Sequence, residues 1–407
     1  MKSKELLIED CFQFIRNGIS VKQNPDSGGL PITRIETISK AVVNPKRVGY
    51  ADIQDNNLGR YEDYILKNGD ILMSHINSMK YLGKSAIYED NPVKLIHGMN
   101  LLCLRPINEK CFPKYINYFF SSGQFKTQLP KISNQSVNQA SFPAGKLKKL
   151  KINLPPLETQ KRIAQILDDA AALRDKTAQL LKEYDLLAQS IFLDMFGDVV
   201  NNPKNWKTKT IEDLVTNEKG SIKRGPFGGA LKKEIFVEDG YLVYEQFHAL
   251  NNDFSFERYY IGESDFQRLK GFVVKPGDII ISCSGVYLGK LAIVPEASKP
   301  GIINQALLKI SLDESKMKRD FFVFHFTQEN FRNKYFGANR GAGIPNFPPM
   351  ASFKKFPFIS PPINLQNLFA EKIALIEQQK ALAKQEQRES EDLFNCLLQK
   401  AFKGELV

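Results

Sequence analysis

The residues best suited to bind an anion gather in one stretch, residues 222–233, where four cationic side chains surround three glycines. Glycine lets backbone N–H groups approach a phosphate, while Lys and Arg supply charge and hydrogen-bond donors to base edges. This composition favours contact with a nucleic acid, although an ordinary surface turn with solvated lysines explains it equally well. The candidate contact residues are Lys223, Arg224, Gly225, Phe227, Gly228, Lys232 and Lys233. The first half of the chain has only Gly28 and Gly29 at the corresponding place, so we expect a different loop there.

Two further groups of polar side chains are candidates for contact with bases or phosphates. Asn and Gln side chains pair bidentately with adenine, and Arg pairs with guanine. Such residues occur in two loops that each precede a long helical segment, and others flank a repeated strand–turn–strand, whose alternative interpretation is a solvated hairpin tip. The loop candidates are Asn134, Gln135, Asn138, Asn339 and Arg340, and the strand–turn–strand candidates are Ser74, His75, Asn77, Lys80, Lys84, Ser282, Ser284, Tyr287 and Lys290.

Several stretches of the sequence resemble parts of catalytic motifs, but each of them is incomplete. Residues 83–85 resemble the end of a phosphate-binding loop, but Ser78 stands where that loop needs a glycine. Residues 341–343 follow no apolar strand, and residues 346–349 carry one residue too many for the Asn-Pro-Pro-aromatic motif of amino-methyltransferases. The five cysteines and four histidines lack metal-ligand spacing. We therefore predict no catalytic residues, no metal and no cofactor held by this chain.

The net charge of +11 is unevenly distributed. Residues 157–198 and 363–407 together carry −4, so the rest of the chain carries +15. Such an excess favours a polyanionic partner over a merely solubilising surface. No apolar run approaches the roughly 18 residues of a membrane helix, and the first residues lack the apolar core of a signal peptide. We therefore expect a cytoplasmic protein with no membrane contact.

The elements that must position these loops begin with two long helices. Residues 154–198 and 360–404 match at an offset of 206, and each opens with a proline pair followed by a run without glycine or proline. Proline is tolerated in the first turn of a helix, and some 40 helical residues make a rod of roughly 60 Å. Apolar residues at heptad spacing predict a coiled-coil seam, although each helix packing separately on its own globe is the alternative. The predicted seam residues are Ile163, Ile166, Leu173, Leu180, Tyr184, Leu187, Ile191, Phe369, Ile376, Leu393 and Leu397.

The repeat extends into the regions that precede the helices. Residues 67–74 resemble residues 275–282, and both contain a short apolar run entered through a glycine turn, which predicts a strand. A second strand should pair beside each of them. The aromatic segments 113–129 and 319–336 space their apolar residues by three and four, which predicts a helix covering each sheet. The sequence therefore predicts a tandem duplication of a mixed α/β globe followed by a long helix.

This order of globe, long helix, globe and long helix resembles the specificity (S) subunit of type I restriction-modification systems. Each motif that carries the resemblance is weak alone, but they occur in this order and partly twice. They are residues 154–164, 196–198, 225–228 and 401–406. The resemblance covers essentially the whole chain.

The resemblance implies a DNA-reading subunit without catalytic activity of its own. Its two target recognition domains each specify one half of a bipartite sequence, with unread base pairs between the halves. The two helices pack as an antiparallel spacer with an internal pseudo-two-fold repeat. They also bind two modification subunits, which are S-adenosylmethionine-dependent adenine methyltransferases, and restriction subunits join to cleave. The expected divisions are residues 1–153 and 199–359 for the two recognition domains, 154–198 for the central helix and 360–407 for the C-terminal helix.

Two other functions fit parts of the same sequence. One is a self-contained DNA enzyme, a nuclease or a methyltransferase, whose turnover needs no partner. The other is a coiled-coil scaffold that binds only protein, which salt-dependent binding of duplex DNA would disfavour. The target sequence and the length of the gap cannot be read from the residues.

Overall fold

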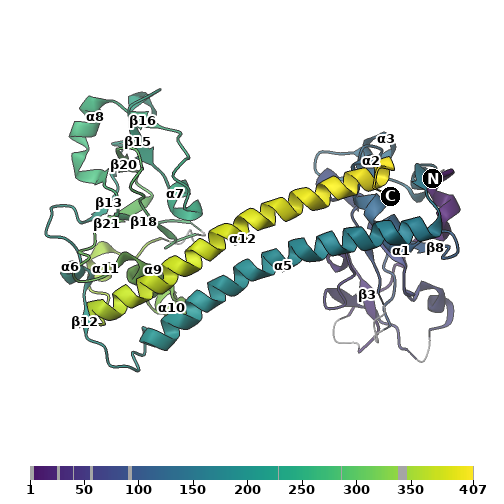
Figure 1. The fold of residues 1–407 in the computed structure, drawn as a ribbon, viewed down its shortest axis with the longest axis horizontal. Helices are drawn as coiled ribbons and strands as arrows, with labels where there is room; N and C mark the ends of the chain where they lie inside the picture. Colours follow the sequence, from purple (N-terminus) through teal and green to yellow (C-terminus); the bar gives the residue numbers. More distant parts are fainter. Residues whose placement is uncertain are drawn as a thin grey trace. The chain divides into compact units, whose positions relative to one another are not determined.

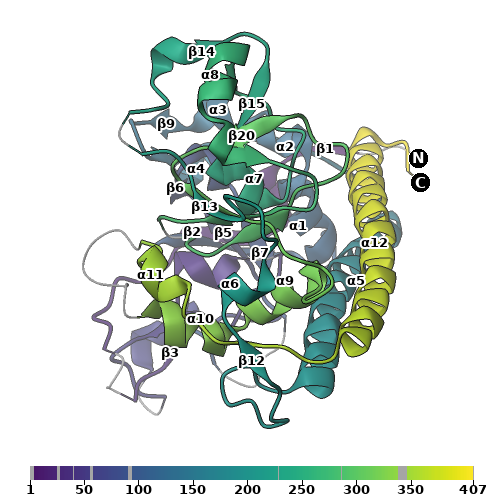
Figure 2. The same ribbon diagram turned by 90° about the vertical axis from the view of Figure 1, so that its left-hand side faces the viewer.

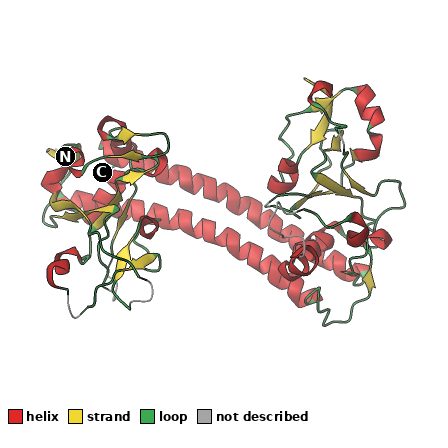
Figure 3. Cartoon of the chain, turned by 180° about the vertical axis from the view of Figure 1, so that it is seen from behind, coloured by secondary structure: helices red, strands yellow, loops and turns green. Residues whose placement is uncertain are grey.

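The structure is a computed structural model that mixes helices and strands throughout (Figure 3). The residues described are 4–24, 28–39, 41–55, 58–89, 94–227, 229–285, 287–337 and 346–406. The chain forms two compact units. Unit 1 comprises Met1–Gln179 and Lys384–Val407, and unit 2 comprises Leu180–Ala383. The predicted mixed α/β class is confirmed.

Unit 1 is built around a four-stranded antiparallel sheet in the order β2-β8-β5-β7. Its strands are β2 (Phe12–Asn17), β8 (Leu101–Pro106), β5 (Ile71–Ser74) and β7 (Ser85–Ile87). Alternate residues of β5 enter different cores, because successive side chains of a strand point to opposite faces. Ile71 and Met73 belong to the core under the aromatic helix, whereas Leu72 belongs to the core on the other face.

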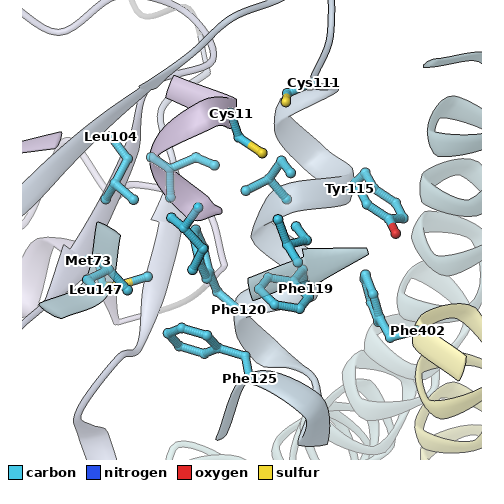
Figure 4. Packing of buried hydrophobic residues seen from close by; sticks show 14 of the residues in the cluster. Cys11, Met73, Leu104, Cys111, Tyr115, Phe119, Phe120, Phe125, Leu147 and Phe402 are labelled. Atoms are coloured by element: carbon cyan, nitrogen blue, oxygen red, sulfur yellow. The ribbon is translucent and has the colours of Figure 1, made fainter. Parts of the chain in front are cut away.

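The larger core of unit 1 joins the sheet to the long helices (Figure 4). Helix α1 (Pro113–Ser121) supplies Tyr115 and Phe119, which are buried between the sheet and the C-terminal end of the chain. The ring of Phe402 lies 5.1 Å from that of Tyr115 and 5.6 Å from that of Phe119, measured between centroids. The aromatic helix α1 therefore packs between the sheet and the long helices.

The remaining elements of unit 1 are short. Its other strands are β1 (Lys4–Leu7), β3 (Pro31–Thr33), β4 (Val48–Tyr50), β6 (Ile76–Asn77), β9 (Asn134–Gln135), β10 (Ala140–Ser141) and β11 (Lys151–Leu154). Its other helices are α2 (Gly123–Lys126), α3 (Leu129–Ile132) and α4 (Ala144–Lys148). Strand β1 pairs with β11, which brings the start of the chain to the residues just before the first long helix.

Unit 2 repeats the same sheet in the order β13-β21-β18-β19. Ile279 and Ile281 of β18 enter the core under the aromatic helix α9, and Ile280 enters the opposite core. The predicted pairing of the two strands beside each glycine turn is confirmed in both units, by β5 with β7 and by β18 with β19. The strands and helices of this repeat are β12 (Thr208–Lys209), β13 (Ile222–Arg224), β18 (Ile279–Ser282), β19 (Leu291–Ile293), β21 (Leu307–Ile310), β22 (Phe358–Ile359), α6 (Ile211–Leu214), α9 (Arg319–Thr327), α10 (Glu329–Phe336) and α11 (Met350–Phe353).

Unit 2 also carries a five-stranded sheet in the order β14-β16-β15-β20-β17, beside helix α8 (Figure 2). Its members are β14 (Phe236–Val237), β15 (Tyr241–Tyr244), β16 (Tyr260–Ile261), β17 (Val273–Val274), β20 (Gly301–Ile303), α7 (Gln246–Asn251) and α8 (Glu263–Arg268). At the equivalent stage of the chain, unit 1 has the two-stranded pair β3-β4 with isolated bridges. The duplicated sheets are thus alike, and the lobes attached to them differ.

The aromatic segments do not form single helices. In unit 1 the helix is interrupted at Ser122, whose extended backbone ends α1 and whose hydroxyl accepts a hydrogen bond from the N–H of Phe125 in α2. In unit 2 the extended Gln328 separates α9 from α10. The prediction of one continuous helix over each segment is therefore wrong, because apolar spacing continues across a capped break.

The two long helices are α5 (Leu157–Phe196) and α12 (Ile363–Lys403) (Figure 1). Unit 1 contains the first part of α5 and the last part of α12, and unit 2 contains the other two parts. In unit 1, Arg174 lies 3.7 Å from Glu391 and over the ring of Phe394. In unit 2, Lys380 pairs with Asp185 at 2.8 Å. No helix among the described residues is long and apolar enough to cross a membrane.

The buried face of each long helix differs from the predicted seam. Ile163, Phe369 and Ile376 are buried, and Ile166, Leu180, Tyr184, Ile191 and Leu397 are half-buried. Leu173, Leu187 and Leu393 are 50%, 47% and 45% exposed, so their assignment to the seam is wrong. The buried stripe of α5 instead follows Ile163, Ala170 and Thr177, which are spaced by seven, together with Leu167 four positions after Ile163. In each unit, the parts of the two long helices pack on the aromatic helix as well as on each other. This additional contact shifts the buried face of the long helices.

Acid is expected to destabilise unit 2 through His325, which is fully buried in α9. Burial lowers the pKa of His325 from 6.5 to about 3. The unfolded state therefore binds a proton that the folded state excludes, and the free energy of unfolding falls as the pH drops below about 6.5. The expected loss is about 2 kcal/mol between about pH 7 and pH 5. Fluorescence of Trp206, the single tryptophan, reports unfolding of this unit. A His325→Phe variant should show a shallower dependence on pH, and an unchanged slope would contradict the assignment.

Candidate nucleic-acid interface

The glycine-rich stretch of unit 2 follows directly from β13, the edge strand of the repeated sheet. The N–H of Gly225 donates to the carbonyl of Leu307 at 2.9 Å, and a Cβ on Gly225 would lie 1.9 Å from the carbonyl oxygen of Asn304. Gly225 is buried, so its missing side chain serves packing against the chain's own backbone. This glycine supports the loop and is not placed to approach a phosphate, contrary to the expectation.

The side chains around Gly225 are presented more openly. The guanidinium of Arg224 lies 5.1 Å from the ring centroid of Phe227, which is 64% exposed. Lys223 lies over the ring of Phe272 at 5.0 Å, and Lys232 and Lys233 are exposed. An exposed aromatic ring with a cation against its face suits contact with nucleotides as well as with solvent. Gly228, Asn339 and Arg340 lie outside the described residues.

The counterpart of this loop in unit 1 is not at Gly28 and Gly29. Asn17 of β2 pairs with Leu102, and Arg224 of β13 pairs with Leu308, the residue 206 positions later. The residue after Asn17 is Gly18, and a Cβ there would lie 2.2 Å from the carbonyl oxygen of Gly98. The same close approach of loop to strand thus requires glycine in both units. The sequence comparison failed here because the two loops differ in length and charge.

In unit 1 the structure brings two predicted groups together. Strand β10 pairs on one side with β6, which contains Asn77, and on the other with β9, which contains Asn134 and Gln135. The amide of Gln135 contacts the Met79 sulfur at 3.5 Å. Asn134, Gln135 and Asn138 are exposed, so this hairpin presents amides beside the turn that carries Lys80.

The unit 2 loop that precedes α11 is tied to the equivalent strand end. Ser284 forms a bridge with Asn346, and the N–H of Phe347 donates to the carbonyl of Cys283. Gln246 of α7 donates to the Ser282 hydroxyl and to the Ser284 carbonyl, both at 2.6 Å. The sequence did not identify Gln246 as a site residue, because its partners Ser282 and Ser284 are far away in the chain and only the fold of unit 2 brings them together.

Several predicted contact residues are buried. Ser74 and His75 are 1% and 7% exposed, and Ser282 is completely buried. Burial lowers the pKa of His75, which favours its neutral form. These side chains end the strands β5 and β18 and shape the turns, whereas Tyr287 and Lys290 lie at the exposed tip. Tyr81, which is 46% exposed at the same position of the unit 1 turn, was missed, although its offset of 206 from Tyr287 could have identified it.

No group of three or more His, Cys, Asp or Glu side chains in the described parts of the chain is arranged to hold a metal ion. The arrangement offers cations, amides and exposed rings on loops that a rigid sheet supports. Groups of these kinds are suited to binding an anionic polymer.

The same fold occurs in solved structures of type I restriction-modification proteins. One, described as the structural basis underlying complex assembly and conformational transition of the type I R-M system, superposes with a TM-score of 0.59 at 14% identity, over 100% of this chain and 98% of that chain. The S subunit from M. genitalium superposes with a TM-score of 0.55 at 13% identity, over 98% of this chain and 96% of that chain. The chain therefore shares the fold of these two solved proteins.

The amino-acid sequence of the first part of the chain shows the same likeness. Residues 2–183 match the family model of the type I restriction modification DNA specificity domain. The resemblance recognised from the sequence is confirmed for residues 2–183, which belong to that domain family. The putative type I restriction enzyme MjaX specificity subunit of Methanocaldococcus jannaschii is 40% identical over 51% of this chain and 48% of its own length. The type I restriction enzyme EcoKI specificity subunit of Escherichia coli K12 is 24% identical over 53% and 46%. The matched region thus spans about half the length of these curated relatives.

Proposed function

We propose that this chain is the DNA-reading specificity subunit of a type I restriction-modification complex. Each unit reads one half of a bipartite sequence in double-stranded DNA. The chain itself is not an enzyme, and the catalytic chemistry resides in partners. Two modification subunits supply S-adenosylmethionine-dependent methylation of adenine, and restriction subunits join them to cleave. The complex works in the cytoplasm.

The observation that carries this proposal is one scaffold used twice with different loops. Both units have the same four-stranded sheet and an aromatic helix beside it. The loop after the edge strand is cationic in unit 2, whereas a polar amide hairpin lies beside the turn in unit 1. Direct base readout depends on such loop side chains. Equal scaffolds with unequal loops therefore fit the two different half-sequences of an asymmetric site.

The spacer role is supported by the helix contacts within each unit. In unit 2, Phe369 of α12 packs against Phe192 and Phe196 of α5 at 5.5 and 5.4 Å between ring centroids. In unit 1, residues late in α12 contact residues early in α5, which is the order of an antiparallel pair. We extend this pairing to the whole length of the helices as an antiparallel coiled coil. A rod longer than one ~34 Å turn of DNA leaves unread base pairs between the half-sites.

Apolar residues on the outer faces of the long helices support docking of protein partners. On α12 the residues Leu368, Leu375 and Leu382 recur every seven positions and are 45%, 63% and 56% exposed. On α5, Leu186 is 67% exposed. Large exposed leucines in a row are costly in water and mark interaction surfaces. Their heptad spacing suits a partner helix.

Equivalent cavities in the two units support binding of the same partner twice. Unit 1 has a cavity of about 520 Å³ between β7, α1 and the start of α5, lined by Ile87 and Lys161 among others. Unit 2 has a cavity of about 470 Å³ at the corresponding place, lined by Ile293 and Asn367. These pairs of residues are separated by the same 206 positions. Two modification subunits can therefore use equivalent anchor points.

Removing the cations of the unit 2 loop is expected to weaken binding of duplex DNA. In the complex with its modification partner, the triple variant Arg224→Ala, Lys232→Ala and Lys233→Ala should bind on the order of a hundredfold less tightly at moderate salt. Loss of phosphate contacts should also flatten the dependence of log affinity on log salt concentration. Fluorescence anisotropy of a labelled duplex, titrated at several salt concentrations, measures both quantities.

The control variant carries Lys176→Ala and Lys182→Ala, which remove exposed cations from α5 and should leave DNA binding unchanged. Unchanged binding by the triple variant would remove this loop from the interface. The purified chain alone, incubated with DNA, Mg²⁺ and S-adenosylmethionine, should neither cleave nor methylate. Turnover without partners would overturn the proposal in favour of a self-contained DNA enzyme.

A further inference from the structure

The turn that precedes β7 in unit 1 is rebuilt with the same backbone hydrogen bonds in unit 2. The N–H of Ser74 donates to the carbonyl of Lys84, and the N–H of Gly83 donates to the carbonyl of Ser74, both at 2.8 Å. Ser282 makes the same two bonds at the same length with the residues 206 positions later. Gly83 has a φ of +73°, a left-handed conformation that favours glycine. The two turns therefore close with the same backbone hydrogen bonds, although the turn of unit 1 is two residues longer.

Each turn holds a tyrosine at its surface. Tyr81 and Tyr287 are 46% and 54% exposed, although the leucine that follows each of them is almost fully buried. The buried leucine anchors the turn, so the phenol beside it is held outward. The ammonium of Lys84 lies 6.0 Å from the ring centroid of Tyr81, and that of Lys290 lies 5.2 Å from the ring centroid of Tyr287. Both units thus hold an ammonium beside the phenol. That of Lys84 is half-buried and donates to the carbonyl of Ser39 at 2.6 Å, whereas Lys290 is exposed.

A second cation in each cluster comes from the aromatic segment. In unit 1, Lys126 of α2 lines a cavity of about 330 Å³ together with Lys80, Tyr81 and Lys84. The described residues that line this cavity include three lysines and no carboxylate. In unit 2 the residue at the offset of 206 is Arg332, which donates to the carbonyl of Leu288 in the turn. The repeat therefore preserves a basic side chain at this position.

Side chains shared by two units that read different sequences must contact what the two half-sites have in common. Duplex DNA offers the same sugar-phosphate backbone at every site, and phosphate contacts position a protein without carrying sequence information. We infer that Tyr81, Lys84 and Lys126 in unit 1, and Tyr287, Lys290 and Arg332 in unit 2, form equivalent clamps for one backbone phosphate each. The inference rests on the proposed function and divides its contacts into a shared phosphate clamp and unit-specific reading loops.

The test measures salt dependence with the full chain and a labelled duplex of scrambled sequence. Lys84→Ala combined with Lys126→Ala should lower the affinity on the order of tenfold and reduce the slope of log affinity against log salt by about one. Lys290→Ala combined with Arg332→Ala should have the same effect, because the two clamps are equivalent. Tyr81→Phe, which removes only the hydroxyl, should weaken binding slightly without changing the slope.

The controls separate the clamp from folding and from the proposed function. Lys84→Arg with Lys126→Arg keeps both charges and should restore the slope, and Lys176→Ala on α5 should leave it unchanged. A slope unaffected by the alanine variants, while the wild-type chain binds DNA, would overturn the clamp alone. Loss of binding to some duplexes of scrambled sequence but not to others would also overturn it, because a base reader would then be indicated. Absence of salt-dependent DNA binding by the wild-type chain would sink the proposed function together with the clamp.

Discussion

A Gln160→Leu substitution is expected to destabilise unit 1 by about 4 kcal/mol, because it leaves three backbone groups without partners in a dry site. Gln160 is completely buried in the first turn of α5. Its side-chain oxygen accepts from the N–H of Phe112, and its amide nitrogen donates to the carbonyls of Lys110 and Pro155, all at 2.8 Å. One glutamine thus ties the start of the long helix to the start of the aromatic helix.

The same device occurs in unit 2. Gln366 is completely buried, accepts from the N–H of Lys318 at 2.9 Å and donates to the carbonyl of Pro361 at 2.8 Å. The repetition explains why a glutamine follows each proline pair at the same distance. Its role is structural, and it aligns the globe with the helix that positions it.

Hydrogen exchange of the backbone amides of α1 measures the effect of Gln160→Leu, because Gln160 bonds the residue directly before that helix. Protection of Pro113–Ser121 is expected to fall sharply, while Arg319–Thr327 in unit 2 stays protected and serves as an internal reference. Gln165→Leu is the matched control, because Gln165 is exposed on the same helix. Its side-chain amide donates a hydrogen bond to the side chain of Asp169. Its effect should stay within about 0.5 kcal/mol. Unchanged protection of α1 in Gln160→Leu would contradict the anchoring role.

Lengthening both long helices by four residues is expected to widen the preferred gap between the half-sequences by about one to two base pairs. The insertions belong after Gln179 in α5 and after Ala383 in α12, where the two units divide. Four residues add about 6 Å to a helix, and base pairs are stacked about 3.4 Å apart. They also turn the helix about 40° beyond one full turn, close to the roughly 35° of twist between neighbouring base pairs. The reading loops themselves are untouched, so both half-sequences should persist.

Mapping methylated adenines in DNA from cells that carry the complete system measures the gap directly. The matched control inserts four residues into α5 alone, which places the two helices out of register and should impair methylation without defining a new gap. A changed half-sequence in the double insertion would indicate that the helices contact bases. An unchanged gap with retained methylation would contradict the spacer role.

The sequence by itself determined the duplicated architecture. Proline pairs followed by long runs without glycine or proline lead into α5 and α12, because proline restricts where a helix begins and nothing inside the runs interrupts it. The apolar runs at residues 70–73 and 278–281 overlap β5 and β18, since a short apolar run after a glycine turn has few other stable conformations. These are local properties of the chain, so they can be predicted directly from the sequence.

The tertiary structure alone decided which faces are buried and which loops meet. Leu173, Leu187 and Leu393 fit a heptad but are exposed, because the aromatic helix of each unit also packs on the long helices and turns a different stripe inward. Gly18 proved to be the counterpart of Gly225 only through the pairing of β2 and β13, which no alignment of unlike loops can supply. Hydrophobic spacing records that a face is apolar, whereas the neighbour that covers it is set by contacts between residues far apart in the chain.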